Sequence, residues 1–186
     1  SRQRDKTATN VIGYFHQNIF RYFPNCVVPR EGWDVIVTQK DGTKIYVEMK
    51  NKHNTMNAAS SQKTYIQMQN QIMQTPNDFC FLVEAIAPCS RNIPWGCSVN
   101  KIHCEHAHIR RVSMDQFYAI VTGETTAFFE MCMQLPKTIE KIVRQNRNLT
   151  VQKDTVLEEL QQMHPDLQIA LYQLAFATYD GFSLLK

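Results

Sequence analysis

The sequence predicts an α/β protein in which helices flank a mixed β-sheet. Three observations lead to this fold class: a β-hairpin pattern over residues 32–52, a nearly continuous apolar run over residues 78–87, and helical patterns before, between and after them. Apolar side chains that alternate with polar ones are typical of strands, and an apolar spacing of three to four residues is typical of helices. The elements follow the order α-β-β-α-β-β-α, and further helices come after them.

Size and composition indicate one folded unit. The chain has 186 residues and 44% of them are hydrophobic, which is enough for a core without disulfide support. We expect residues 1–186 to form a single domain, with a core at about 7–122 and a helical C-terminal part at about 124–186. No apolar run reaches the roughly 18 residues of a membrane span, and no secretory signal opens the chain. We therefore expect no membrane partner and a cytoplasmic location.

The first predicted elements are a helix and a hairpin. A helix over residues 7–22 ends at Pro24, and a short strand is expected at residues 26–28. Residues 32–52 then alternate apolar with polar side chains on both sides of a turn that contains Gly42. Two such runs around a glycine turn indicate a β-hairpin.

The hairpin turn decides which side chains share a face of the sheet. Glu48 and Lys50 project to the same side of the second strand, because strand side chains alternate. A two-residue loop would pair Asp34 with Met49, on the other side. A three-residue loop over residues 40–42 pairs Asp34 with Glu48 instead. The chemistry and the turn residues both favour the three-residue loop.

Two carboxylates and an ammonium group on one face suit phosphodiester hydrolysis. The oxygens of Asp34 and Glu48 can hold a hard divalent cation such as Mg²⁺. Lys50 can orient an attacking water or help to deprotonate it, and can stabilise negative charge on phosphorus. The pattern Glu-x-Lys is common, however, and an ion pair between Glu48 and Lys50 on a solvated strand is the simpler interpretation.

The middle of the chain predicts a helix and a buried strand. A polar loop at residues 53–61 leads into a helix at about residues 61–73, and Ser60 or Ser61 is the candidate cap of that helix. Residues 78–87 are apolar almost throughout, which indicates a strand that is buried on both faces. We expect this strand at the centre of the sheet.

The last part of the predicted core begins with a long connection. Residues 88–108 have room for one short hairpin, and a strand follows at residues 109–112. Ser113 and Gln116 have the spacing of a capping box for a helix over residues 114–122, and Gly123 ends that helix. Later helical patterns lie at residues 125–135, 136–145, 156–160 and 167–177.

Several segments together resemble one protein family. They are residues 12–18, 46–57, 60–65 and 110–113, and the resemblance spans about residues 10–145 and returns weakly at 175–182. Asp34, Glu48 and Lys50 stand in the signature positions of the PD-(D/E)xK nuclease superfamily, with Gly32 in the place of the usual proline. The chain is similar to bacterial type II restriction endonucleases that cut GGNCC- and GGWCC-type palindromes. Members usually have a further N-terminal segment, which we expect to be missing here.

The resemblance implies a restriction-endonuclease-like core and a site-specific endonuclease that acts on double-stranded DNA at a short G/C-rich palindrome. It implies that Asp34, Glu48 and Lys50 are catalytic, and that Asp34, Glu48 and the backbone carbonyl of Met49 bind Mg²⁺, for which Mn²⁺ can substitute. A palindrome presents two scissile phosphates, so we expect a homodimer. A DNA methyltransferase of the same system is the expected functional partner.

The residues after the hairpin are predicted to contact DNA. Lys52 continues the face of Glu48 and Lys50, and the polar loop ends at a helix N-terminus, which favours phosphate binding. For later basic residues, a solvated helix face is the simpler interpretation. The predicted DNA-binding residues are Lys52, His53, Asn54, Asn57, Ser60, Gln62, Lys63, Arg110 and Arg111.

Other functions stay open at this point. A structure-specific DNA repair nuclease would share the same core but would cut without a unique fragment pattern. A non-catalytic DNA-binding module would use Asp34 and Glu48 only in surface ion pairs. The cysteines and histidines of residues 89–108 also permit a zinc site, but without a Cys-x-x-Cys pair we favour buried thiols and solvated or DNA-facing histidines.

Overall fold

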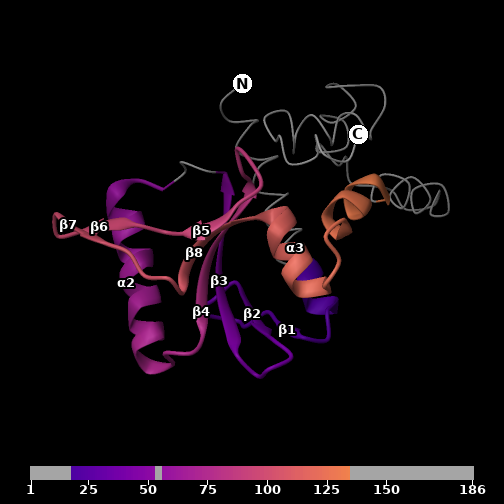
Figure 1. The fold of residues 1–186 in the computed structure, drawn as a ribbon, viewed down its shortest axis with the longest axis horizontal. Coiled ribbons are helices and arrows are strands. Elements are labelled where there is room, and N and C mark those ends of the chain that lie inside the picture. Colours follow the sequence, from indigo (N-terminus) through magenta and orange to yellow (C-terminus); the bar gives the residue numbers. More distant parts are fainter. Residues whose placement is uncertain (1–17, 53–55, 135–186) are drawn as a thin grey trace, which may run out of the picture.

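The computed structural model describes residues 18–52 and 56–134 of the chain. A mixed sheet with strand order β1-β2-β3-β4-β8-β5 forms its centre (Figure 1), which confirms the α/β class. The strands of this sheet are β1 (Cys26–Val27), β2 (Val35–Thr38), β3 (Lys44–Lys52), β4 (Phe79–Ile86), β5 (Asn92–Pro94) and β8 (Ile109–Ser113). A separate hairpin consists of β6 (Cys97–Val99) and β7 (Ile102–Cys104). The helices are the 3-10 helix η1 (Phe20–Tyr22), α2 (Ala58–Gln74) and α3 (Met114–Thr122), and residues 127–134 are also helical.

Three neighbouring strands of the sheet run parallel. β4 pairs in parallel with both β3 and β8, whereas β1, β2 and β5 pair with their neighbours in the antiparallel direction. Helix α2 connects β3 to β4, because two parallel strands need a crossover that brings the chain back to the same end of the sheet. The apolar run therefore forms a central strand, as predicted, and its two faces are both covered.

Helices cover both faces of the sheet (Figure 1). On one face, Tyr65 and Met68 of α2 are fully buried against side chains of β4 and β8. On the other face, the ring of Phe20 from η1 lies 4.8 Å from that of Phe117 and 5.0 Å from that of Tyr118, both in α3. The face covered by α2 is called the α2 face below, because it carries the candidate site.

The β2–β3 turn has the predicted three-residue loop. The strands pair from Val35 opposite Val47 to Thr38 opposite Lys44, and an N–H···O bond of 2.8 Å joins the next two residues. This leaves residues 40–42 as the loop, and Gly42 adopts a left-handed φ of 86°. Glycine reaches this conformation without the clash that a Cβ atom causes. The register that brings Asp34 toward Glu48 is therefore confirmed.

Helix α2 begins earlier than predicted. Its N-cap is Asn57, whose Oδ1 accepts a hydrogen bond from the Ser60 N–H at 2.8 Å. The prediction of Ser60 or Ser61 as the cap is wrong, because the first turn of the helix already includes both serines. Asparagine caps a helix as well as serine does, since its side-chain oxygen reaches the same free N–H groups.

Helix α3 has the predicted ends but not the predicted capping box. Ser113 is the N-cap residue without a side-chain capping bond, since its hydroxyl oxygen accepts the N–H of Arg91 at 2.9 Å and its O–H donates to Asp115. Gln116 donates from Nε2 to Ser90 Oγ at 2.8 Å instead of reaching back to the cap. At the other end Gly123 has a φ of 81° and terminates the helix as expected.

The long connection over residues 88–108 contains more structure than the sequence indicated. It forms β5, which pairs with β8, and the β6–β7 hairpin, which extends outward past α2 (Figure 1). The short predicted strand at residues 26–28 is confirmed as β1, and η1 matches the end of the first predicted helix. The rest of that helix and the helices predicted after residue 134 lie outside the described residues. Among the helices of the described part, none has the length and apolar character that crossing a membrane requires.

We predict that Gly42→Ala lowers the free energy of unfolding by about 1–2 kcal/mol, the cost of a left-handed conformation for a residue with a Cβ atom. A Cβ atom at Gly42 would meet nothing within 4 Å, so the backbone conformation alone sets this cost. Gly42→Asn is the matched control and should cost less, because asparagine enters this region more readily. Urea titrations measure both. Equal losses would show that the left-handed turn is not what the glycine provides.

Candidate active site

Glu48 and Lys50 lie on the α2 face of β3. Tyr46, two residues before Glu48, packs in the cluster that α2 covers, and strand alternation carries Glu48 and Lys50 to the same face. Lys50 Nζ is 2.6 Å from Glu48 Oε1, and the two side chains are only 29% and 20% exposed. The ion pair that the sequence allowed is therefore present, but it is half-buried rather than fully solvated.

Asp34 joins this pair from the residue before β2. Its N–H donates to the carbonyl oxygen of Val47 at 2.9 Å, and its Oδ2 accepts the N–H of Met49 at 2.7 Å. Asp34 is thus fixed to the backbone of β3 on either side of Glu48, through its own N–H at Val47 and through its carboxylate at Met49. The alternative register, with Asp34 opposite Met49, is wrong. The structure brings together the three residues that the sequence singled out.

Opposing influences act on the pKa of Asp34. Burial raises the pKa of its carboxyl group, and the nearby Glu48 carboxylate raises it further. The N–H of Met49 and the ammonium of Lys50 oppose this change, but the net direction is upward. A half-buried carboxylate next to a second one is an environment that a bound cation would relieve.

The donor set at this site fits a hydrated Mg²⁺ ion. Magnesium binds through one or two carboxylates and keeps several waters, so Asp34 and Glu48 are sufficient protein ligands. Within residues 18–52 and 56–134, no group of three or more His, Cys, Asp or Glu side chains could hold a metal ion. The zinc alternative therefore finds no site in this part of the chain. Cys97 and Cys104, two of its candidate ligands, are register partners in the β6–β7 hairpin.

The predicted DNA-binding residues fall into two places. Around the start of α2, Asn57 and Ser60 form the cap, and Gln62 donates to Asn100 Oδ1 at 3.0 Å, which ties α2 to the tip of the β6–β7 hairpin. Lys63 is exposed and lines a hollow that Trp33 and α2 form. Lys52 ends β3 but its side chain is not described, and His53 and Asn54 lie outside the described residues.

Arg110 and Arg111 point to opposite faces of β8. Arg110 donates to Asn92, reaching its carbonyl oxygen at 2.6 Å, and to the carbonyl oxygen of Ala107 at 3.2 Å. Arg111 lies on the α2 face, where its Nε and Nη2 donate to Glu84 Oε1 at 2.8 and 2.5 Å. Only Arg111 therefore shares the face of Asp34, Glu48 and Lys50.

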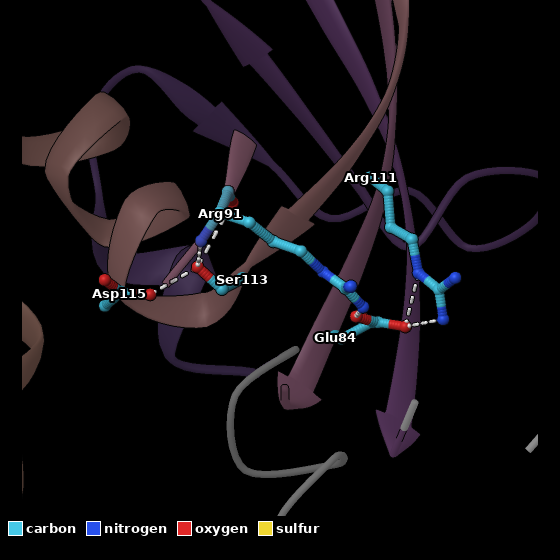
Figure 2. A network of polar contacts seen from close by, with 5 residues as sticks. All are labelled: Glu84, Arg91, Arg111, Ser113 and Asp115. Carbon is cyan, nitrogen blue, oxygen red and sulfur yellow. Dashed lines mark hydrogen bonds and ion pairs between the residues drawn. The ribbon is translucent and has the colours of Figure 1, made fainter. Parts of the chain in front are cut away.

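Glu84 is the centre of a polar network that the sequence did not reveal (Figure 2). The side chain of Glu84 is almost fully buried, and its second oxygen accepts from Nη2 of Arg91. The one available signal was a carboxylate within the apolar run of β4, which a strand buried on both faces carries only when it is paired. The partner Arg91 could not be found in this way, because it comes from the connection that follows.

Register places this network beside the candidate site. Lys50 pairs with Glu84, and Glu84 pairs with Ser113 on the next strand. Because neighbouring strands are about 4.8 Å apart, the two groups are adjacent rather than separate. Both lie toward the carboxyl ends of three parallel strands, which is the edge where open α/β sheets bind ligands.

We predict that Asp34→Asn raises the melting temperature at pH 7 in EDTA. A raised pKa means that folding the charged Asp34 costs free energy, and this cost disappears below the ordinary value of 3.8, where the group is protonated in both states. Asparagine is neutral throughout and can still accept the Met49 N–H. The gain should therefore be present at pH 7 and absent near pH 3, as calorimetry can measure.

Asp41→Asn is the control with the opposite sign. Hydrogen bonds from Thr43 lower the pKa of Asp41, so its charge stabilises the fold above the ordinary pKa and this contribution is lost as the pH falls. The control should lower the melting temperature at pH 7 and not at pH 3. An equal effect of Asp34→Asn at both pH values would contradict the electrostatic cause.

Comparison with known proteins identifies the family. A family model described as Eco47II restriction endonuclease matches residues 1–144. The type II restriction enzyme Sau96I of Staphylococcus aureus is 30% identical over 154 residues, which cover 78% of this chain and 59% of that enzyme. The type II restriction enzyme Eco47II of Escherichia coli is 28% identical over 159 residues, which cover 77% of this chain and 63% of that enzyme.

The chain spans about three-fifths of the length of these curated relatives. No solved structure is significantly similar to it. The family match covers most of the chain, including all the described residues up to the end of the helical segment at 127–134. The protein thus belongs to the Eco47II restriction endonuclease family.

Proposed function

We propose that this protein is a type II restriction endonuclease that hydrolyses phosphodiester bonds of double-stranded DNA at a short G/C-rich palindrome, GGNCC-like by resemblance. The observation that carries the proposal is the meeting of Asp34, Glu48 and Lys50 on one face of the β2–β3 hairpin, in a chain of a restriction endonuclease family. Neither the spacing in the sequence nor the family alone would be as specific. Such an enzyme acts inside a bacterial cell, in the cytoplasm.

Each of the three side chains has a distinct role in the proposed reaction. Asp34 and Glu48, with the backbone carbonyl of Met49, hold Mg²⁺ or its substitute Mn²⁺. The bound ion supplies Lewis acidity to the phosphate and lowers the pKa of a water molecule. Lys50 would orient the attacking water, assist its deprotonation and stabilise the charge that develops on phosphorus. The 2.6 Å contact with Glu48 already holds the ammonium group beside the carboxylates.

DNA contacts are proposed around this centre. Helix α2 starts where the chain returns from the carboxyl end of β3, and a helix N-terminus attracts phosphate. Lys63 in its second turn adds a positive charge, and Lys52, His53 and Asn54 precede it in the chain. The β6–β7 hairpin extends past α2 (Figure 1) and can reach a groove.

Symmetry requires a second copy of the site. A palindrome has two scissile phosphates related by a two-fold axis, and one Asp34, Glu48 and Lys50 site can serve only one of them. We therefore propose a homodimer on DNA. A DNA methyltransferase that protects the same palindrome completes the proposed system as a functional partner.

A plasmid digest tests the function. The wild-type protein should give a discrete fragment pattern with Mg²⁺ and no cutting in EDTA. Glu48→Gln should abolish cutting with Mg²⁺, because one carboxylate ligand is lost. Glu124→Gln, an exposed acid beyond α3, is the control and should cut normally. Metal-dependent cutting without discrete fragments would support the repair nuclease instead. DNA binding without any cutting would support the non-catalytic module.

Lys50→Ala should lower kcat by about 10²–10³-fold while DNA affinity changes little, because Lys50 is proposed to act on the attacking water and the transition state. Lys44→Ala is the matched control, since Lys44 lies on the same face at the other end of β3. Single-turnover cleavage and equilibrium binding separate the two effects. Equal losses of binding and cleavage in Lys50→Ala would contradict the catalytic role.

A further inference from the structure

The buried network of Glu84, Arg91 and Arg111 has more positive than negative charge. Glu84 is 1% exposed and supplies one carboxylate, whereas the two arginines supply two guanidinium groups. The arginine side chains are 18% and 26% exposed, so they close the network on the side that faces solvent. One positive charge is therefore left over among these three side chains, because Asp115, the other acid in Figure 2, accepts from Ser113 and Ser90 rather than from either guanidinium group.

The arginines also have unused hydrogen-bond donors. A guanidinium group carries five N–H donors, of which Arg111 gives two to Glu84 and Arg91 gives one. The Nε atom of Arg91 is buried and has no hydrogen-bond partner within the described residues. An unpaired buried donor costs free energy, and an acceptor that arrives with a ligand would remove that cost.

Glu84 holds both guanidinium groups in place. Arg111 binds Oε1 through two nitrogens, and Arg91 binds Oε2, so the carboxylate fixes the two planar forks beside each other (Figure 2). Arg91 is further anchored by its backbone, whose N–H donates to Ser113 Oγ at 2.9 Å. Fixed arginine forks match the oxygens of a phosphate group, and little rotamer freedom is lost when they bind it.

The position of the network indicates which phosphate it meets. Glu84 is the register partner of Lys50, and Arg111 is two strands away from Glu48 at the same level of the sheet. The acidic groups that attract a cation thus lie just before β2 and on β3, whereas Arg111 lies on β8 and Arg91 lies just before β5, the neighbour of β8. A DNA strand that crosses this edge would place the cleaved phosphate on the first half and a neighbouring phosphate on the second.

We propose that Arg91 and Arg111 bind a backbone phosphate of the DNA strand next to the phosphate that is cleaved, and that Glu84 is a positioning residue for both. This inference rests on the proposed nuclease function and adds two residues, Glu84 and Arg91, for which the sequence analysis predicted no role. The phosphodiester anion neutralises the surplus charge of the network and supplies acceptors for its free donors. When this phosphate is bound in the correct position, the neighbouring phosphate, which is cleaved, lies beside Lys50.

The test measures how DNA affinity depends on salt. Arg91→Gln and Arg111→Gln should each lower the slope of log K against log salt by about one unit, for duplexes with and without the cognate site. The double variant should lose no more than about one unit, because both side chains hold the same phosphate. Arg21→Gln, on the exposed surface of η1, removes an equal charge from the opposite face and is the control.

A second measurement leaves the protein intact. In duplexes that carry one methylphosphonate, the neutral group should lower the slope by about one unit at a single position next to the cleaved phosphate. The same duplex should produce no further loss with Arg111→Gln. The measurement on the wild-type protein stays informative even if an arginine variant folds poorly.

Glu84→Gln separates positioning from plain structural support. It keeps both arginine charges, so the salt slope should stay near the wild-type value, while kcat falls at least about tenfold because the phosphate is misplaced. A network that only supports the fold would lower the melting temperature of the Glu84, Arg91 and Arg111 variants. At temperatures well below the melting temperature, it would leave the salt slope and kcat unchanged. That result would overturn the inference.

The outcome also distinguishes the inference from the function on which it rests. A wild-type protein that cuts DNA, combined with arginine variants whose slopes equal that of Arg21→Gln, overturns the phosphate site alone. A wild-type protein that neither binds nor cuts DNA overturns the proposed function itself.

Discussion

The pairing register of β2 against β3 is the constraint on which the candidate site depends. A shift of one residue would turn Asp34 toward the core and away from Glu48, because strand side chains alternate. The buried pairs Val35–Val47 and Val37–Ile45 hold the register, since a slip would expose all four side chains. The left-handed Gly42 makes the matching loop. Core packing and turn chemistry therefore fix the geometry of a site that neither of them touches.

Charge is distributed unevenly along the carboxyl edge of the parallel strands. Three carboxylates, Asp34, Glu48 and Glu84, are at least half-buried there. Glu48 and Glu84 form ion pairs with basic side chains, and the charge of Lys50 acts on Asp34. Buried ion pairs contribute little net stability, because the loss of hydration offsets most of the attraction. Apolar residues would serve folding better in these positions. The concentration of costly groups at one edge is what a binding site requires and what a structural role leaves unexplained.

The sequence predicted the parts of the fold that depend on local patterns. The β2–β3 hairpin, central β4 and the glycine end of α3 follow from side-chain alternation, an apolar run and a left-handed residue. The cap of α2 and the failed capping box of α3 were missed, because Asn57, Ser60 and Ser113 have several partners within reach and tertiary contacts decide among them. Local chemistry names candidates but does not choose between them.

The candidate site was predictable only where its residues lie on one hairpin. Asp34, Glu48 and Lys50 are connected through a turn whose length can be read from the sequence, so their meeting could be derived. Arg91 reaches Glu84 from a connection that has no periodic pattern, and Arg111 reaches it from a strand whose neighbour was unknown until the sheet order was seen.

The charged groups at the carboxyl edge of the parallel strands link ligand binding to folding. Ligands that bind only the folded state stabilise it, and the stabilisation grows with the logarithm of ligand concentration divided by Kd. A cation at Asp34 and Glu48 would offset the cost of burying the charge of Asp34, and an anion at Arg91 and Arg111 would accept from donors that Glu84 does not use. The two halves have opposite sign, so a single ligand that presents both a metal ion and phosphates satisfies them together. Double-stranded DNA with its bound cations is such a ligand, so the electrostatics of this edge and the family of the chain both support the proposed function.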